Sequence, residues 1–171
     1  KKCLKTIFFL LTFWSVQSSA ENVLTLDWFD LIPETERQQG AFGAMPNISH
    51  DDSIVPQQSQ LGTTRKELNN SKIRIPGFVI PLEGDDEVTT EFLLVPYFGA
   101  CIHVPPRPPN QIIYVKFKKG APLAELWDVV NVVGVLKTTV IYHELGQAGY
   151  LLEGIRIEPY EDEEYDEYEP T

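Results

Sequence analysis

The sequence predicts an all-β fold, a small five-stranded Greek-key barrel with one short helix. Short segments rich in β-branched and aromatic residues recur along the chain, and turn residues such as proline, glycine and asparagine bound them. There is no internal repeat, and no long helical pattern separates these segments, so an alternating α/β architecture is excluded. The five predicted strands are 72–83, 89–98, 111–117, 127–140 and 149–160.

The first predicted strand, "KIRIPGFVIPLE", contains an internal Pro-Gly pair. Gly77 predicts a bulge or a strong bend, and Pro76 and Pro81 favour a sheet edge or a barrel corner. Between the third and fourth strands, Pro122 can open a short helix that runs to Trp127. This order favours a barrel of the oligonucleotide/oligosaccharide-binding (OB) type. A generic β-sandwich stays open, because strand count alone does not fix the topology.

The fourth predicted strand carries a glycine among β-branched residues, in "VVNVVGVLK". Val132, Gly134 and Leu136 alternate along it and therefore share one face. We predict that this face points into the barrel, where Gly134 lets the wall taper.

The first twenty residues have the pattern of a secretory signal peptide. Three lysines precede the apolar run 7–14, and a stretch of small and polar residues ends in Ala20, after which we predict cleavage. A membrane anchor is the alternative, but the run is shorter than the roughly 20 residues that span a bilayer. The sequence therefore predicts a periplasmic or secreted protein without stable membrane insertion.

The rest of the chain predicts one domain with a tail. Residues 21–63 form an N-terminal segment and polar linker in this prediction, residues 64–160 the β-barrel domain, and residues 161–171 an acidic disordered tail. The formal net charge of −11 becomes −14 once the three leading lysines are removed. This charge argues against nucleic-acid binding through a basic face. The tail is either a solvated appendage or a weak collector of divalent cations.

Cysteine use draws attention to one residue. The chain has two cysteines, Cys3 and Cys101, and cleavage after Ala20 leaves Cys101 alone. No disulfide can then form within the chain. An unpaired thiol in an oxidising compartment is expected to be buried, bound to metal, paired between chains or used in chemistry.

Three stretches carry a family resemblance: "KIRIPGFVIPLE", "TTEFLLVPYFGACIHVPPRPPNQIIYV" and "GYLLEGIRIEPYE". They resemble the bacterial exported family known as domain of unknown function 3299, over about residues 61–161. The most specific element is "PYFGACIHVPP" followed by "PPNQ"; Arg107 stands where the family tends to continue with proline. The resemblance implies a small exported domain without established chemistry, sometimes associated with transporter systems linked to zinc.

Cys101 and His103 form a candidate metal half-site. Residues two apart in an extended strand point to the same face about 7 Å apart, and zinc accepts both thiolate sulfur and imidazole nitrogen. A tetrahedral site needs two more ligands, for which His143 is the best third candidate and Glu91 is one of the available carboxylates. A metal here would be bound weakly, bound transiently or shared with a partner, and the predicted cofactor is zinc.

Two other interpretations of Cys101 stay open. Free cysteine is among the most buried residue types, so Cys101 can be a small apolar packing residue. It can also be a redox or nucleophilic thiol. That case is weaker, because His103 on the same strand face lies beside the thiol and is not aimed at it, and no resolving cysteine is available.

The proline-rich run after Cys101 predicts an extended, preorganised loop. It serves either as a docking surface for a partner protein or as a rigid turn whose amides bond the local backbone. The candidate partner-binding residues are Tyr97, Phe98, Pro105, Pro106, Arg107, Pro108, Pro109, Asn110 and Gln111.

Two functions from different classes follow. The favoured one is an exported, non-enzymatic binding or accessory module that handles zinc or another metal alongside an envelope transporter or another periplasmic protein. The alternative is a thiol-dependent redox or catalytic protein centred on Cys101. Chelation distinguishes them, since removal of a bound metal should speed alkylation of the thiol only in the first case.

Overall fold

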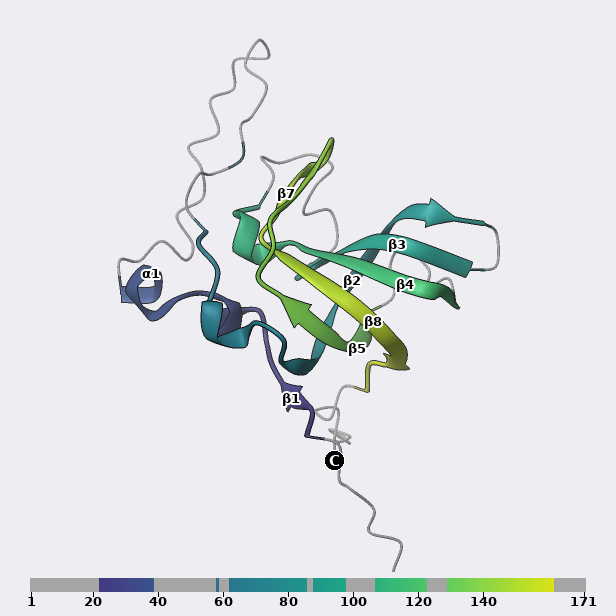
Figure 1. The fold of residues 1–171 in the computed structure, drawn as a ribbon, viewed down its shortest axis with the longest axis horizontal. Coiled ribbons are helices and arrows are strands. Elements are labelled where there is room, and N and C mark those ends of the chain that lie inside the picture. The colour runs from purple at the N-terminus through teal and green to yellow at the C-terminus, as the bar shows by residue number, and fades with distance from the viewer. Residues whose placement is uncertain are drawn as a thin grey trace, which may run out of the picture.

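The computed structural model describes residues 22–38, 58, 62–85, 88–97, 107–122 and 129–161 (Figure 1). The predicted signal peptide lies outside these residues, as does the predicted tail beyond Glu161. Within the described ranges no helix is long and apolar enough to cross a membrane. The strands are β1 (Leu24–Thr25), β2 (Lys72–Gly84), β3 (Val88–Val95), β4 (Ile113–Pro122), β5 (Val129–Lys137), β6 (Ile141–His143), β7 (Gly146–Ala148) and β8 (Tyr150–Pro159).

Five strands close into a barrel, as the sequence predicts. They pair in the order β2-β3-β4-β8-β5, and the additional pairing of β5 with β2 closes the ring. All these pairs are antiparallel except β4 with β8, which run parallel over Ile113–Lys116 and Tyr150–Glu153. This is the Greek-key order of an OB-type barrel.

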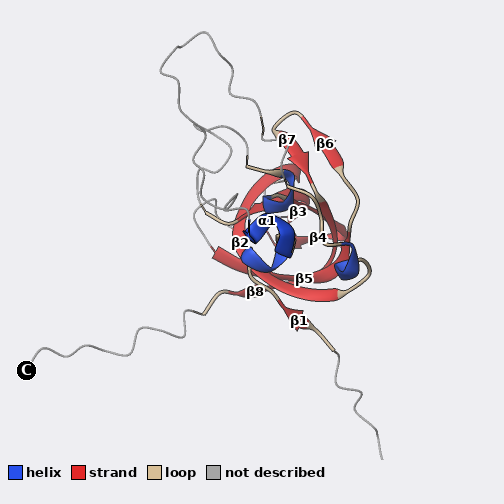
Figure 2. Cartoon of the chain, turned by 90° about the vertical axis from the view of Figure 1, so that its left-hand side faces the viewer, coloured by secondary structure: helices blue, strands red, loops and turns tan. Residues whose placement is uncertain are grey.

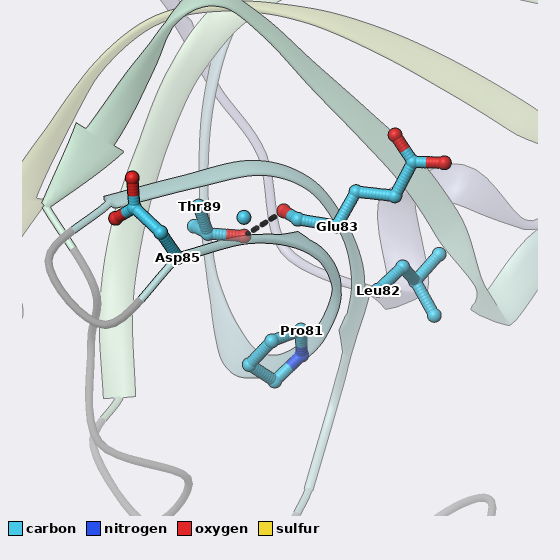
Figure 3. Close-up of a pocket in the computed structure, with 6 residues that line it drawn as sticks. Pro81, Leu82, Glu83, Asp85 and Thr89 are labelled. Carbon is cyan, nitrogen blue, oxygen red and sulfur yellow. Dashed lines mark hydrogen bonds between the residues drawn. The ribbon is translucent and has the colours of Figure 1, made fainter.

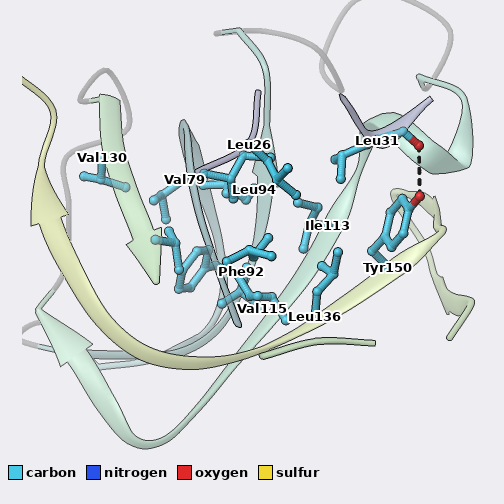
Figure 4. Packing of buried hydrophobic residues seen from close by; sticks show 14 of the residues in the cluster. Leu26, Leu31, Val79, Phe92, Leu94, Ile113, Val115, Val130, Leu136 and Tyr150 are labelled. Atoms are coloured by element: carbon cyan, nitrogen blue, oxygen red, sulfur yellow. Dashed lines mark hydrogen bonds between the residues drawn. The ribbon is translucent and has the colours of Figure 1, made fainter. Parts of the chain in front are cut away.

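The barrel interior is filled by alternate residues of its strands. Along β2, Ile73, Ile75, Gly77 and Val79 are buried while their neighbours are partly exposed, which is the period of two expected for a strand with one face in the core. Figure 4 shows side chains from β2, β3, β4, β5 and β8 meeting in this core.

The predicted inward face of β5 is confirmed. Val132 and Leu136 are fully buried, and Gly134 between them is buried as well. A Cβ atom on Gly134 would lie 2.5 Å from the backbone oxygen of Glu153, so β8 approaches too closely for any side chain. The bulge suggested for Gly77 is not observed, because the β2–β5 register runs unbroken through this residue. The register shifts of β2 lie between Pro81 and Gly84 instead.

The N-terminal segment completes one edge of β2. β1 pairs in parallel with β2, the backbone N–H of Leu26 donates to the oxygen of Arg74 at 2.9 Å, and the indole Nε1 of Trp28 donates to the oxygen of Pro76 at 2.7 Å. β3 takes over the pairing from Phe78 onward. Backbone groups of β2 that β3 does not reach therefore find partners in residues 24–28.

Helical elements gather at one end of the barrel (Figures 1 and 2). Leu31, from a short 3-10 helix, is fully buried there, and its carbonyl oxygen accepts a hydrogen bond from the hydroxyl of Tyr150 at 2.9 Å (Figure 4). The same hydroxyl accepts from the backbone N–H of Arg65 at 2.7 Å. The 3-10 helices are η1 (Phe29–Leu31), η2 (Lys66–Leu68) and η3 (Pro109–Gln111), and the short α-helix is α1 (Glu34–Gln38).

The α-helix that the structure describes lies in a segment that was not predicted to be helical. Its bounds, Glu34–Gln38, fall in the segment that was interpreted as linker. A helix was predicted from Pro122 to Trp127. Pro122 is the last residue of β4, and residues 123–127 lie outside the described part of the chain. None of the residues of α1 is buried, so it offers no apolar stripe that a sequence pattern can reveal.

A second apolar cluster lies on the outer face of the barrel. Leu93 and Val95 of β3 point away from the interior, yet both are fully buried. The β6–β7 hairpin contributes Ala148 and Ile141 to this cluster, and Tyr114 of β4 joins it. The hairpin therefore packs on the outside of the β3–β4 wall.

Candidate functional site

The segment with Cys101 and His103 is attached at the barrel end where the helical elements gather. β3 ends at Val95, Tyr97 follows, and the chain is described again from Arg107. The guanidinium carbon of Arg107 lies 4.1 Å from the centroid of the Tyr97 ring, a cation–π contact. The two ends of the intervening segment are therefore held together. The predicted site residues Phe98, Cys101, His103, Pro105 and Pro106 lie outside the described residues.

Asn110 and Gln111 are buried and bond residues far away in the sequence. The Asn110 amide donates to a carboxylate oxygen of Glu36 at 3.0 Å and to the backbone oxygen of Thr63 at 3.1 Å. The Gln111 amide donates to the backbone oxygen of Trp28 at 2.9 Å. Their side chains are thus used inside the chain, where they join η3 to the N-terminal segment.

Pro108 and Pro109 lie in close contact with Gly62, and Pro109 also with Gly149. A Cβ on Gly62 would lie 2.9 Å from atoms of both prolines, and one on Gly149 would lie 2.8 Å from the oxygen of Pro109. The backbone N–H of Gly149 donates to that oxygen at 2.6 Å. The end of the proline-rich run is therefore fixed by direct backbone contact.

A single glutamine joins this region to the β6–β7 hairpin. Gln58 donates through Nε2 to the backbone oxygens of Arg107, at 2.6 Å, and Gln147, at 2.8 Å. Its Oε1 accepts from the backbone N–H of Gln147 at 2.7 Å. The amide thus pairs with the edge of β7 as a strand residue would. The polar stretch 34–61 gave no signal that distinguished Gln58 from its neighbours.

His143, the third predicted metal ligand, lies on β6 above the outer face of β4. Its ring centroid is 6.3 Å from that of Tyr114, and its Nδ1 accepts a hydrogen bond from the backbone N–H of Leu145 at 3.2 Å. In the neutral ring an accepting Nδ1 leaves the proton on Nε2, so neither nitrogen has a free lone pair. Metal binding by His143 requires this bond to break.

Glu91, one of the carboxylates considered as a ligand, forms hydrogen bonds with side chains of β4. Lys116 donates to it at 2.8 Å, and the hydroxyl of Tyr114 donates to its other oxygen. The hydrogen bonds from Lys116 and then Tyr114 lower the pKa of Glu91. Burial, followed by the bond to Glu91, raises the pKa of Tyr114 to about 12. The alternation of "EFLLV" and "YVKF" places these polar groups on one face.

No group of three or more histidine, cysteine, aspartate or glutamate side chains that could hold a metal occurs in the described part of the chain. Cys101 and His103 lie outside it, so the half-site stays a prediction.

A pocket lies at the turn between β2 and β3. In Figure 3 the carboxylates of Glu83 and Asp85 point to opposite sides, while the hydroxyl of Thr89 donates to the backbone oxygen of Glu83 at 3.0 Å. The two carboxylates therefore do not converge on a common ligand. The pocket is lined by Pro81, Leu82, Glu83, Gly84, Asp85 and Thr89.

Comparison with known proteins identifies the family. The sequence model of a protein family of unknown function, DUF3299, matches residues 28–159. A crystal structure of a DUF3299 family protein from Pseudomonas aeruginosa PAO1 is similar, with 37% sequence identity and a TM-score of 0.68, over 84% of this chain and 99% of that one. Among curated proteins, no sequence matches. The chain therefore belongs to the DUF3299 family.

Proposed function

We propose that this protein is an exported binding module, without a catalytic role of its own, that uses its OB-type barrel to present residues 98–106 to a metal ion and a partner protein. The observation that carries the proposal is the closure of this segment at its base, where Arg107 stacks on Tyr97 at 4.1 Å. A segment whose ends are fixed loses less conformational entropy on binding than one with free ends.

The surroundings of this base support a presenting role. Asn110 and Gln111 are at most 3% exposed and are used in bonds within the chain, and Gln58 holds the backbone of Arg107. The hydrogen-bonded elements thus extend to Arg107, the residue from which the chain is described again. Sites held by such rigid surroundings keep their geometry best.

Zinc is the metal of this proposal, because the thiolate and imidazole of Cys101 and His103 are zinc ligands and the family resemblance includes a zinc-linked context. Since His143 and Glu91 are engaged in bonds within the chain, the remaining ligands come from a partner. An envelope transporter component is the proposed partner, and export rests on the signal-like pattern of residues 1–20.

Calorimetric titration of zinc into the protein, beside Cys101→Ser and His103→Ala variants, tests the metal part. A shared half-site predicts that both substitutions abolish the same binding event. The apparent affinity should rise with pH until the free thiol ionises near about 8.5, since a thiolate ligand must lose its proton. His143→Ala is the matched control, because its engaged ring predicts unchanged binding.

Equal zinc uptake by the wild-type protein and both variants would overturn the metal part of the proposal. Chelation distinguishes the thiol-dependent alternative. If Cys101 is held by metal, a chelator increases the rate at which iodoacetamide alkylates it. A thiol that is already alkylated rapidly, with a chelator making no difference, would instead support redox or nucleophilic chemistry.

A further inference from the structure

The pairing of β4 with β3 is interrupted by a register shift. Lys116 pairs with Glu91 and Ala121 with Thr89, so the segment Phe117–Gly120 faces a single residue of β3. Its two ends are anchored. Phe117 keeps its ring in the core at 7% exposure, and Gly120 takes a φ of 75°, a conformation that favours glycine. Lys118 and Lys119 between them are exposed, and this four-residue segment is the β4 bulge.

The two bulge lysines lack the ion pairs that most other basic side chains of the described chain form. Neither side chain has an ion pair or a hydrogen bond within the residues that the structure describes. In the same part of the chain six basic side chains do form ion pairs: Arg37, Arg65, Arg74, Lys116, Lys137 and Arg156. The bulge therefore presents two neighbouring positive charges to solvent on a protein whose net charge is −11.

The acidic C-terminal segment begins at the same end of the barrel. β4 and β8 run parallel, with Lys116 opposite Glu153, and Figure 1 shows both strands ending on the side away from the helical elements. β8 ends at Pro159, which pairs with Val130 near the start of β5. Glu161 is eight residues beyond Glu153, the partner of Lys116, so it lies at most about 26–29 Å along the chain from that pair. The ten residues that follow Glu161 span at most about 33–36 Å when extended, which exceeds this distance.

We propose that the acidic segment 161–169 of this chain docks on the β4 bulge, with its carboxylates against Lys118 and Lys119. The segment "EDEEYDEYE" contains seven acidic residues, so several registers satisfy two lysines. The contact lies at the opposite end of the barrel from Tyr97 and Arg107 and is independent of the proposed function.

Tethering favours this occupant over an external one. A segment joined to the barrel by a few residues acts at an effective concentration in the millimolar range. A separate acidic molecule has to approach a protein of net charge −11, and long-range repulsion slows that approach. The attached segment needs no such encounter, because it is already held near the barrel surface.

Amide spectra by NMR test the proposal on the chain with residues 162–171 and on a variant that ends at Glu161. Removal of the segment should shift the amide resonances of Lys118, Lys119 and Gly120. A synthetic peptide of residues 161–171, added to the shortened variant, should reverse these shifts at millimolar concentration. Sodium chloride at 0.5 M should remove most of the difference, because salt screens exposed charges.

Carbodiimide cross-linking provides the second measurement. Cross-links should join the bulge lysines to carboxylates of 162–169 within one molecule, and the double variant Lys118→Gln, Lys119→Gln should lose them. Lys66→Gln is the matched control, because Lys66 is also exposed and has no ion pair among the described residues. This control should keep the cross-links.

Three results would overturn the proposal. One is a shortened variant whose bulge amides do not shift at low salt. Another is an equal loss of cross-links in the Lys66→Gln control, which indicates nonspecific charge effects. The last is a cross-link yield that rises with protein concentration, which assigns the bulge to the acidic segment of a second copy.

Discussion

The barrel end where the helical elements gather, called the closed end below, is held together in a different way from the β6–β7 hairpin. At the closed end, buried polar groups bond partners far along the chain: Gln111 bonds Trp28, and Tyr150 bonds Leu31. The hairpin strands pair over six residues, and Tyr142 on it is 75% exposed. Buried bonds between distant segments are lost only when the fold opens, whereas an exposed hairpin can open locally. The closed end should therefore follow global unfolding, and the hairpin should not.

The largest effect on stability is expected from a substitution in the barrel wall, at Gly134 of β5. Gly134→Val places a side chain where even a Cβ lies 2.5 Å from the backbone oxygen of Glu153 and 3.0 Å from Cγ of Leu152. We expect the free energy of unfolding, measured by urea denaturation, to fall by about 1–3 kcal/mol. Val135→Ala, at the partly exposed neighbour, is the control with a smaller loss. Unchanged stability of Gly134→Val would show that the wall can yield.

Tyr150→Phe tests the closed end itself. The substitution removes the hydroxyl that donates to Leu31 and accepts from the backbone N–H of Arg65, and it leaves both backbone groups without this partner. We expect a loss of about 1–3 kcal/mol, with exchange protection reduced across the whole barrel. If only residues near Arg65 lost protection, the closed end would not be coupled to global unfolding.

The pH dependence of stability provides a second test of Tyr150. Burial is the main cause that raises its pKa to about 12. The unfolded chain loses this proton near pH 10, while the folded chain keeps it. The contribution of Tyr150 to stability is therefore constant below pH 10 and should fall between pH 10 and 12, in denaturant titrations at each pH. Tyr150→Phe should remove part of this fall, and Tyr114→Phe another part, since the pKa of Tyr114 is also raised to about 12.

The five barrel strands were predictable from the sequence, because each is a short run of β-branched and aromatic residues bounded by turn residues, whereas β6 and β7 are only three residues long and were not predicted. β2 alternates between buried and partly exposed residues from Lys72 to Ile80, and the glycine of β5 lies on the predicted inner face. α1 was missed because its five residues include none that is buried, so no periodic pattern exists.

The candidate site was less predictable than the fold. Asn110 and Gln111 were identified from a local motif, but their partners Glu36 and Trp28 lie more than seventy residues away. Gln58 matters because of where its amide lies, which composition does not reveal. Chemistry at Cys101 and His103 stays a prediction from residue type and spacing.

Gln58→Ala addresses the hairpin. The variant loses the two hydrogen bonds that hold the edge of β7 at Gln147 and the one that holds Arg107. With a net value of about 1 kcal/mol for such a bond, hydrogen exchange at the Gln147 amide should become several-fold faster. The barrel amides should be unaffected. Gln147→Ala is the control, because its backbone bonds to Gln58 remain. Uniformly faster exchange would show that hairpin and barrel open together.

The smallest effect is expected from removing residues 162–171. Glu161 is exposed, and β8 ends two residues earlier at Pro159, which pairs with Val130. Docking of the acidic segment on the β4 bulge would involve exposed charges, whose contribution to stability is small and is screened by salt. We therefore expect the melting temperature to change by less than about 2 °C at 0.15 M salt, with any decrease seen only at lower salt. Calorimetry of both chains at two salt concentrations measures this. A large decrease that persists in high salt would mean that these residues bury apolar surface, and the end of the barrel that carries the bulge would then be as firmly closed as the other.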